Sequence, residues 1–194
     1  MSLIFTPFYL PITGLLALFF LSYLNDLIPW YYKLTVMMLV YIFTVLLPTF
    51  LIHLYRKYQG WTLLELGIKE RRMVPYIISI VCYFACYYIL NLYHTPRFIS
   101  IVVITALAIQ IICAIINVWW KISTHSAAIG GVTGALLSFA LIFQFNPTWW
   151  LCLALFLSGM VGTSRMILRQ HSLSQVLAGY FVGLLLAAFI ILML

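Results

Sequence analysis

Long apolar stretches dominate this sequence and leave few folds open to it. A helix that crosses the hydrocarbon core of a bilayer needs ~20 residues, and in lipid every backbone polar group must be bonded within the protein. Seven stretches of roughly that kind occur: Ile4–Leu24, Leu34–Tyr55, Tyr76–Tyr93, Phe98–Val118, Ser126–Phe145, Trp149–Thr163 and Leu173–Leu194. The sequence therefore predicts an all-α fold, a polytopic membrane bundle of six to seven transmembrane helices. The stretch Trp149–Thr163 is short, which makes it the least secure span.

The composition supports a membrane protein and argues against nucleic-acid binding. Of the 194 residues, 66% are hydrophobic and 7% are charged, whereas soluble domains carry about 25% charged residues. The net charge of +7 comes from ten basic residues scattered between apolar stretches, so they form no face for nucleic acid. No Lys or Arg precedes the first stretch, which we interpret as a retained span rather than a cleaved signal. No change of composition divides the chain, so we expect a single membrane domain over residues 1–194.

The polar loops are predicted to meet on one side of the membrane. If every stretch crosses, three loops share that side: Arg56–Pro75, Trp119–His125 and Ser164–His171. Eight of the ten basic residues fall there, and only Lys33 and Arg97 fall on the other side. Loops that are far apart in sequence are therefore expected to converge at one membrane face.

Residues suited to phosphate chemistry lie in these loops. Arg165 and His171 are six residues apart, in the polar segment between the last two apolar stretches. A guanidinium group is well shaped to hold a pair of phosphate oxygens, and a neutral imidazole can act as a nucleophile or carry a proton near pH 7. His125 would flank the same site from the second loop. Further basic side chains would join the anion site: Lys69, Arg72 and Lys121.

The spacing of these residues resembles that of the type-2 phosphatidic acid phosphatase superfamily, whose soluble relatives include vanadium haloperoxidases. Its third motif, Ser-Arg-x-x-x-x-x-His-x-x-x-Asp, is matched by Ser164, Arg165 and His171, with Gln175 in place of the Asp. The second motif, Pro-Ser-Gly-His, is present as Ile122-Ser123-Thr124-His125 and keeps only Ser123 and His125.

The first motif of that family, Lys-x-x-x-x-x-x-Arg-Pro, is matched loosely. Lys69, Arg72 and Pro75 have the right residue types at altered spacing. Together the three motifs place a phosphatase-like core at about residues 56–185.

The resemblance implies hydrolysis of a lipid phosphate in two displacements. His171 would attack phosphorus to form a phosphohistidine, and His125 would protonate the leaving oxygen and then activate water. The implied phosphate-binding residues are Arg165, Arg72, Lys69, Ser123, Lys121 and Ser164. The scheme needs no metal and no cofactor, and the chain has only three acidic residues, Asp26, Glu65 and Glu70, too few for a two-metal site.

Gln175 is the main departure from the family pattern. In the family an Asp accepts the imidazole N–H and stabilises the charge that develops on the ring. Gln175 lies four residues after His171, on the same face of a helix, and its amide oxygen can accept that hydrogen bond without supplying a charge. We therefore expect a less basic nucleophile and a slower enzyme that is still active.

Two other classes of function remain open from the sequence. The altered motifs would also suit a protein that binds or transports lipid phosphate without hydrolysing it. Four histidines in a helical bundle could instead ligate haem.

The family resemblance also sets expectations for the substrate and for the location in the cell. Candidate substrates are phosphatidic acid, phosphatidylglycerophosphate, a polyprenyl diphosphate and a lipid A phosphate. The resemblance favours a bacterial inner membrane with a periplasmic active face, although the positive-inside rule points to the cytoplasm. The oligomeric state is left open.

Overall fold

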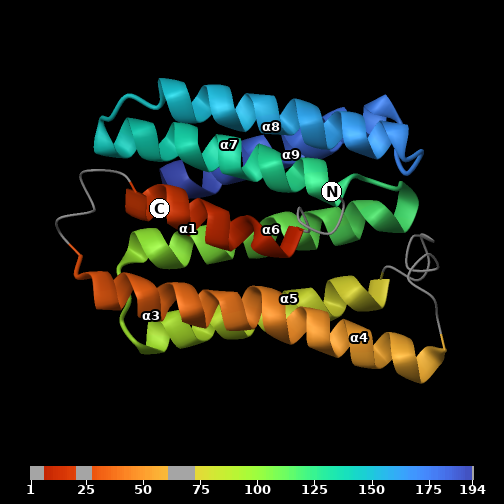
Figure 1. Cartoon of the computed structure of the whole chain (residues 1–194), viewed down its shortest axis with the longest axis horizontal. Coiled ribbons are helices and arrows are strands. Elements are labelled where there is room, and N and C mark those ends of the chain that lie inside the picture. Colours follow the sequence, from red (N-terminus) through yellow and green to blue (C-terminus); the bar gives the residue numbers. More distant parts are fainter. Residues whose placement is uncertain (1–6, 21–27, 61–72, 194) are drawn as a thin grey trace.

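Helices make up nearly all of the chain that the computed structural model describes, which is residues 7–20, 28–60 and 73–193. They lie side by side along one axis (Figure 1), and these described ranges contain no strand. The elements are η1 (Pro7–Tyr9), α1 (Leu10–Phe20), α3 (Trp30–Tyr41), η2 (Ile42–Leu46), α4 (Leu47–Gln59), α5 (Met73–Leu92), α6 (Arg97–Trp119), α7 (Thr124–Phe143), α8 (Thr148–Ile167) and α9 (Leu173–Met193).

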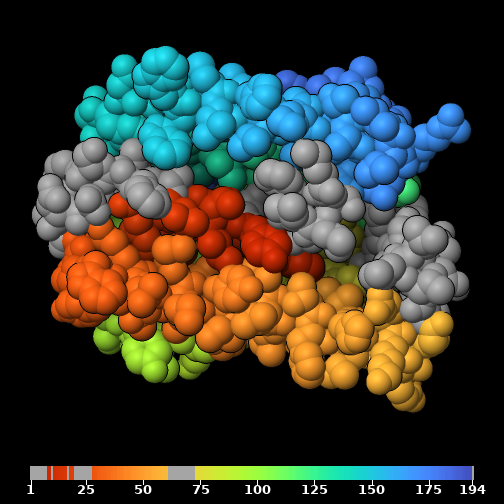
Figure 2. Space-filling view, viewed as in Figure 1, coloured from red at the N-terminus to blue at the C-terminus, as the bar shows by residue number. Residues whose placement is uncertain are grey.

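Six helices in the described part of the chain are long and apolar enough to cross a membrane. One is the continuous segment Trp30–Gln59, which comprises α3, the π-helical turn η2 and α4, and the others are α5 to α9. The predicted all-α membrane bundle of six to seven helices is confirmed. The first apolar stretch is described only in part, as η1 and the 11-residue helix α1. On the face drawn in Figure 2, α1 lies between the α3–α4 segment and α8.

Helix α8 is longer than the apolar stretch that predicted it. The stretch ended at Thr163, but the helix covers 20 residues, Thr148–Ile167, and is a full candidate span. It is still the least apolar of the six candidate spans, and it reaches full length because the helix continues through polar residues whose side chains are bonded locally. Ser164 Oγ donates to the carbonyl of Val161 at 2.8 Å, and Arg165 donates to Gln170.

Helix α9 is apolar on all sides, so the size of its side chains decides its orientation. Its bulky residues are exposed, as expected for a face turned to lipid: Leu173, Leu177, Phe181, Leu185, Phe189 and Leu192. Small residues occupy the opposite face, where Gly179, Gly183 and Ala187 are buried against α7. Small residues of this kind let membrane helices approach closely.

Four glycines set the separation of α7 and α9. A Cβ on Gly130 would overlap the carbonyl of Tyr180, and a Cβ on Gly183 would overlap that of Ala127. A Cβ on Gly134 would also overlap the carbonyl of Leu184, and a Cβ on Gly179 would lie 2.5 Å from the carbonyl oxygen of Ser123. These two helices are therefore fixed in register at backbone contact.

The polar loops lie at one end of the bundle. In Figure 1 the ends of α4, α6 and α8 and the starts of α5, α7 and α9 lie together at the right. Lys33 and Arg97, in the first turns of α3 and α6, lie at the opposite end. The predicted convergence of distant loops is confirmed for the described residues, while Lys69 and Arg72 lie outside them.

Candidate active site

The turn before α9 holds His171 and Gln175 together. His171 is 8% exposed, and its Nδ1 lies 3.1 Å from Gln175 Oε1. The same Oε1 accepts the backbone N–H of Ser172 at 3.2 Å, and the backbone N–H of Gln175 points to Ser172 Oγ at 3.5 Å. This reciprocal pair is a capping box, which bonds two of the backbone donors at the start of a helix. Gln175 thus caps α9 and contacts His171 with one oxygen atom.

The capping box fixes the tautomer of the neutral imidazole. A backbone N–H can only donate, so the Gln175 atom that faces Ser172 must be the amide oxygen rather than the nitrogen. Because His171 Nδ1 faces that same oxygen, Nδ1 must carry a proton and donate. In the neutral ring, Nε2 then holds the lone pair. The lone pair that a neutral His171 can offer to a ligand is therefore on Nε2.

Arg165 is a buried cation at the end of α8. It is 6% exposed, and its Nη1 donates to Gln170 Oε1 at 2.6 Å. All three carboxylic acids of the chain, Asp26, Glu65 and Glu70, lie outside the described residues. The acceptor in this hydrogen bond is thus a neutral amide, which adds no negative charge beside the guanidinium group.

The second loop lies directly against the third. The backbone N–H of Ser123 donates to the carbonyl of Gln175 at 3.4 Å, and Gly179 packs on the Ser123 carbonyl. Ser123 is fully buried and caps α7, with its Oγ 2.9 Å from Ser126 Oγ. His125 follows in the first turn of α7 and is half-buried, as is Lys121.

Two helix N-termini, those of α7 and α9, lie at this end of the bundle. The N-terminus of a helix carries a partial positive charge and presents backbone N–H groups, which favours anions. Arg165 and Lys121 add full positive charges to the same end. The end of the bundle is therefore suited electrostatically to hold a phosphate group.

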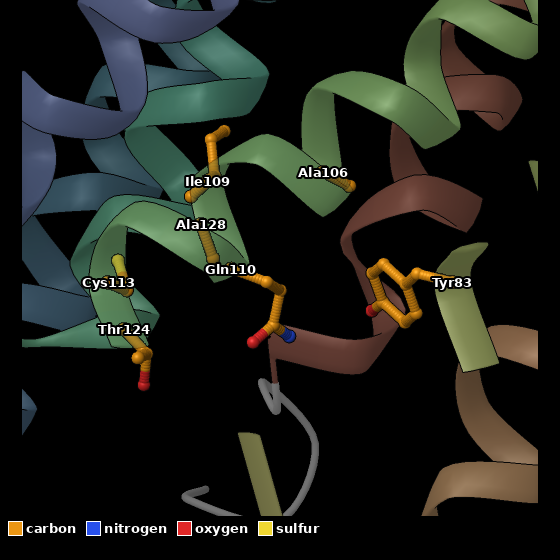
Figure 3. Close-up of a pocket in the computed structure, with 7 residues that line it drawn as sticks. All are labelled: Tyr83, Ala106, Ile109, Gln110, Cys113, Thr124 and Ala128. Atoms are coloured by element: carbon orange, nitrogen blue, oxygen red, sulfur yellow. The ribbon is translucent and has the colours of Figure 1, made fainter. Parts of the chain in front are cut away.

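A small cavity lies next to this end, between α5, α6 and α7. Its volume is about 20 Å³, and its lining includes Thr124, the residue before His125. Deeper inside, Tyr83 of α5 and Gln110 of α6 point toward each other (Figure 3) and are hydrogen-bonded. A volume of this size, with mostly apolar lining, is too small for a lipid tail.

The structure brings together most of the residues predicted for the site. Those that lie at this end of the bundle are His125, His171, Gln175, Arg165, Ser123, Lys121 and Ser164. The hydroxyl groups of Ser123 and Ser164 bond their own helices rather than facing away from them. Among the described residues, no group of three or more His, Cys, Asp or Glu side chains is placed to hold a metal ion.

Two residues of the site were missed from the sequence, Ser172 and Gln170. Ser172 could have been found, because Ser-x-x-Gln before an apolar run is a capping-box pattern. Gln170 gave no such signal, because its contact with Arg165 depends on how the chain turns after α8.

A family comparison agrees with this geometry. The model of the PAP2 superfamily matches residues 117–194. This C-terminal part of the chain therefore resembles the PAP2 superfamily. The matched PAP2 region contains α7, α8 and α9 with both site histidines, and it excludes Lys69 and Arg72. No curated protein and no solved structure matches the chain significantly.

Proposed function

We propose that this integral membrane protein is a metal-independent phosphatase of lipid phosphates. The observation that carries the proposal is the arrangement around His171 in the PAP2 region, with Nδ1 held by Gln175 and Nε2 left as the lone-pair atom. A buried arginine six residues earlier, on the adjoining helix end, supplies positive charge for a phosphate group.

The proposed reaction has two displacements. His171 Nε2 attacks phosphorus, the P–O bond to the lipid breaks, and His125 gives a proton to the leaving oxygen. His125 then takes a proton from water, whose oxygen attacks the phosphohistidine. The P–N bond breaks, inorganic phosphate leaves, and both histidines return to their starting states.

The cations stabilise the negative charge on the phosphate oxygens in both transition states. Arg165 is the central one, and Lys121 adds a second charge from the loop before α7. Lys69 and Arg72 remain predictions, since they lie outside the described residues. Ser123 and Ser164 stay predicted phosphate ligands, each of which would have to turn its hydroxyl group from its helix.

The placement of the site supports a lipid substrate. The described loops between the spanning helices are short, so little of the described chain lies outside the membrane to bind a soluble molecule. A phosphomonoester or diphosphate with its tail in the bilayer could reach the end of the bundle directly. We further propose one membrane domain over 1–194, a phosphatase-like core at about 56–185, and a bacterial inner membrane with the site on the periplasmic face.

Gln175 also favours a second candidate, a protein that binds or transports lipid phosphate on the same fold. The neutral amide keeps His171 in place but gives no charge to stabilise an imidazolium ion. Such a protein would bind a lipid phosphate at Arg165 and release no phosphate.

The experiment that separates these functions is phosphate release by detergent-purified protein from a panel of lipid phosphates, with and without vanadate. The panel contains phosphatidic acid, phosphatidylglycerophosphate, a polyprenyl diphosphate and a lipid A phosphate. We expect release from at least one lipid and inhibition by vanadate. Binding of a lipid without any release, by protein shown to be folded, would support the transport candidate and contradict the phosphatase.

A substitution at Gln175 tests the role of its neutral amide. The Gln175→Glu substitution keeps the acceptor for the Ser172 N–H and adds a negative charge beside His171. This charge should stabilise the imidazolium ion by roughly one pKa unit and so raise turnover by about tenfold.

The Gln175→Ala substitution should lower turnover while expression stays intact, and should cost α9 about 1 kcal/mol of capping stability. Both are checked by kcat together with the melting temperature. Unchanged turnover in Gln175→Ala would remove Gln175 from the catalytic unit.

A further inference from the structure

Gln170 is placed between the two residues on which the proposed reaction depends. It precedes His171 in sequence, and its side chain contacts Arg165. We propose that Gln170 is a positioning residue that orients the Arg165 guanidinium group toward phosphate through a contact that adds no negative charge. This inference rests on the proposed function and adds a residue to that site.

Gln170 and Arg165 are joined by two hydrogen bonds. Nη1 of Arg165 donates to Gln170 Oε1 at 2.6 Å, and the backbone N–H of Gln170 donates to the Arg165 carbonyl at 3.1 Å. The second bond holds the Gln170 backbone over the last turn of α8. The first then fixes the direction of a guanidinium group that is 6% exposed. A planar guanidinium with one N–H held has fewer orientations to lose when it binds an anion.

The chain turn after α8 makes this contact possible. Arg169 has a left-handed backbone with φ of 51°, and its N–H donates to the Met166 carbonyl at 2.9 Å. With the bond from Gln170 to Arg165, this is a Schellman motif, the common way to end a helix. The reversal of the chain at Arg169 returns the Gln170 side chain to Arg165.

The neutral amide matters as much as the geometry. A carboxylate at position 170 would accept the same hydrogen bond but would pair with the guanidinium charge, and the pair would attract a phosphate less. Glutamine fixes the donor and adds no negative charge beside it. If Gln170 only stabilised the turn, a carboxylate at this position would serve equally well. The Gln170→Glu substitution therefore distinguishes a positioning role from a purely structural one.

The test compares Gln170→Glu, Gln170→Ala and the wild type in two measurements, the rise in melting temperature caused by vanadate and the vanadate inhibition constant. We expect Gln170→Glu to melt at or above the wild-type temperature without ligand, yet to bind vanadate about tenfold more weakly, the scale of one charge-assisted interaction. Gln170→Ala should weaken vanadate binding to a similar extent. In a lipid assay, both variants should raise KM more than they lower kcat.

Gln144→Ala is the matched control. Gln144 also follows a helix in a left-handed conformation, with φ of 53°, and its side chain donates to the Leu141 carbonyl at 2.6 Å. It lies at the opposite end of the bundle, after α7. Gln144→Ala should therefore leave vanadate binding unchanged.

A double variant covers the case in which Gln170→Ala loses stability. Arg169→Gly relieves the left-handed strain at that position and should stabilise the turn. If Gln170 positions Arg165, the Arg169→Gly/Gln170→Ala protein should regain its melting temperature and still bind vanadate more weakly than Arg169→Gly alone.

The outcomes separate this inference from the proposed function. Equal vanadate binding by wild type and Gln170→Glu would overturn the role of Gln170 and leave the phosphatase standing. A wild-type protein that is folded but gains no stability from vanadate would overturn the anion site, and the role of Gln170 with it.

Discussion

Replacing His171 by alanine should abolish phosphate release from any lipid that the wild-type protein hydrolyses. Without the imidazole no covalent intermediate can form, and loss of a nucleophile typically lowers kcat on the order of 10³-fold or more. The fold should survive, because the capping box between Ser172 and Gln175 does not need the His171 side chain. The measurement is kcat with the melting temperature of the same preparation.

His53→Ala is the control for this experiment. His53 is exposed on α4, where its Nδ1 lies 3.1 Å from Arg56 Nη2, and it belongs to no part of the proposed site. It should leave kcat unchanged. Wild-type turnover by His171→Ala would exclude a phosphohistidine at this position.

Placing a side chain on Gly183 should have the largest effect on folding. Even alanine would drive a Cβ into the backbone carbonyl of Ala127, where no rotamer change can relieve the overlap. The helices α7 and α9 would have to separate, at a cost of about 3 kcal/mol or more. Since α7 carries His125 and α9 begins beside His171, the separation would also displace the site. We expect little folded protein by size-exclusion chromatography, and a low melting temperature for what remains.

Gly159→Ala provides the comparison on another spanning helix. Gly159 lies on α8, and a Cβ added there meets no atom within 4 Å. Its substitution by alanine should be neutral or slightly stabilising, as expected for a helix interior. A Gly183→Ala protein as stable as Gly159→Ala would contradict backbone contact between α7 and α9.

Much of the fold could be predicted because lipid permits few alternatives. Apolar stretches near the length of a bilayer must be helical, and an alternating path then brings distant loops to one end of the bundle. The end of α8 could not be placed in this way. Hydropathy falls at Thr163, but the helix continues to Ile167 because Ser164 and Arg165 find partners within their own turn and the next.

The site was predictable only where residue spacing carries chemistry. Arg165, His125 and His171 could be identified as candidates by type and order, since few residue types can hold or attack phosphate. The contacts that orient them were less accessible. The shared oxygen of Gln175 and the return of Gln170 to Arg165 both depend on backbone turns, which hydropathy does not encode.

The most direct test of the account is to trap the covalent intermediate. Purified wild-type protein would be mixed with a radiolabelled lipid phosphate that it hydrolyses, quenched within the first turnover, and mapped by peptide. The account predicts label on the peptide that contains His171, stable in base and lost in acid, and no label in His171→Ala. Rapid turnover with label on another residue, or with none on His171, would contradict it.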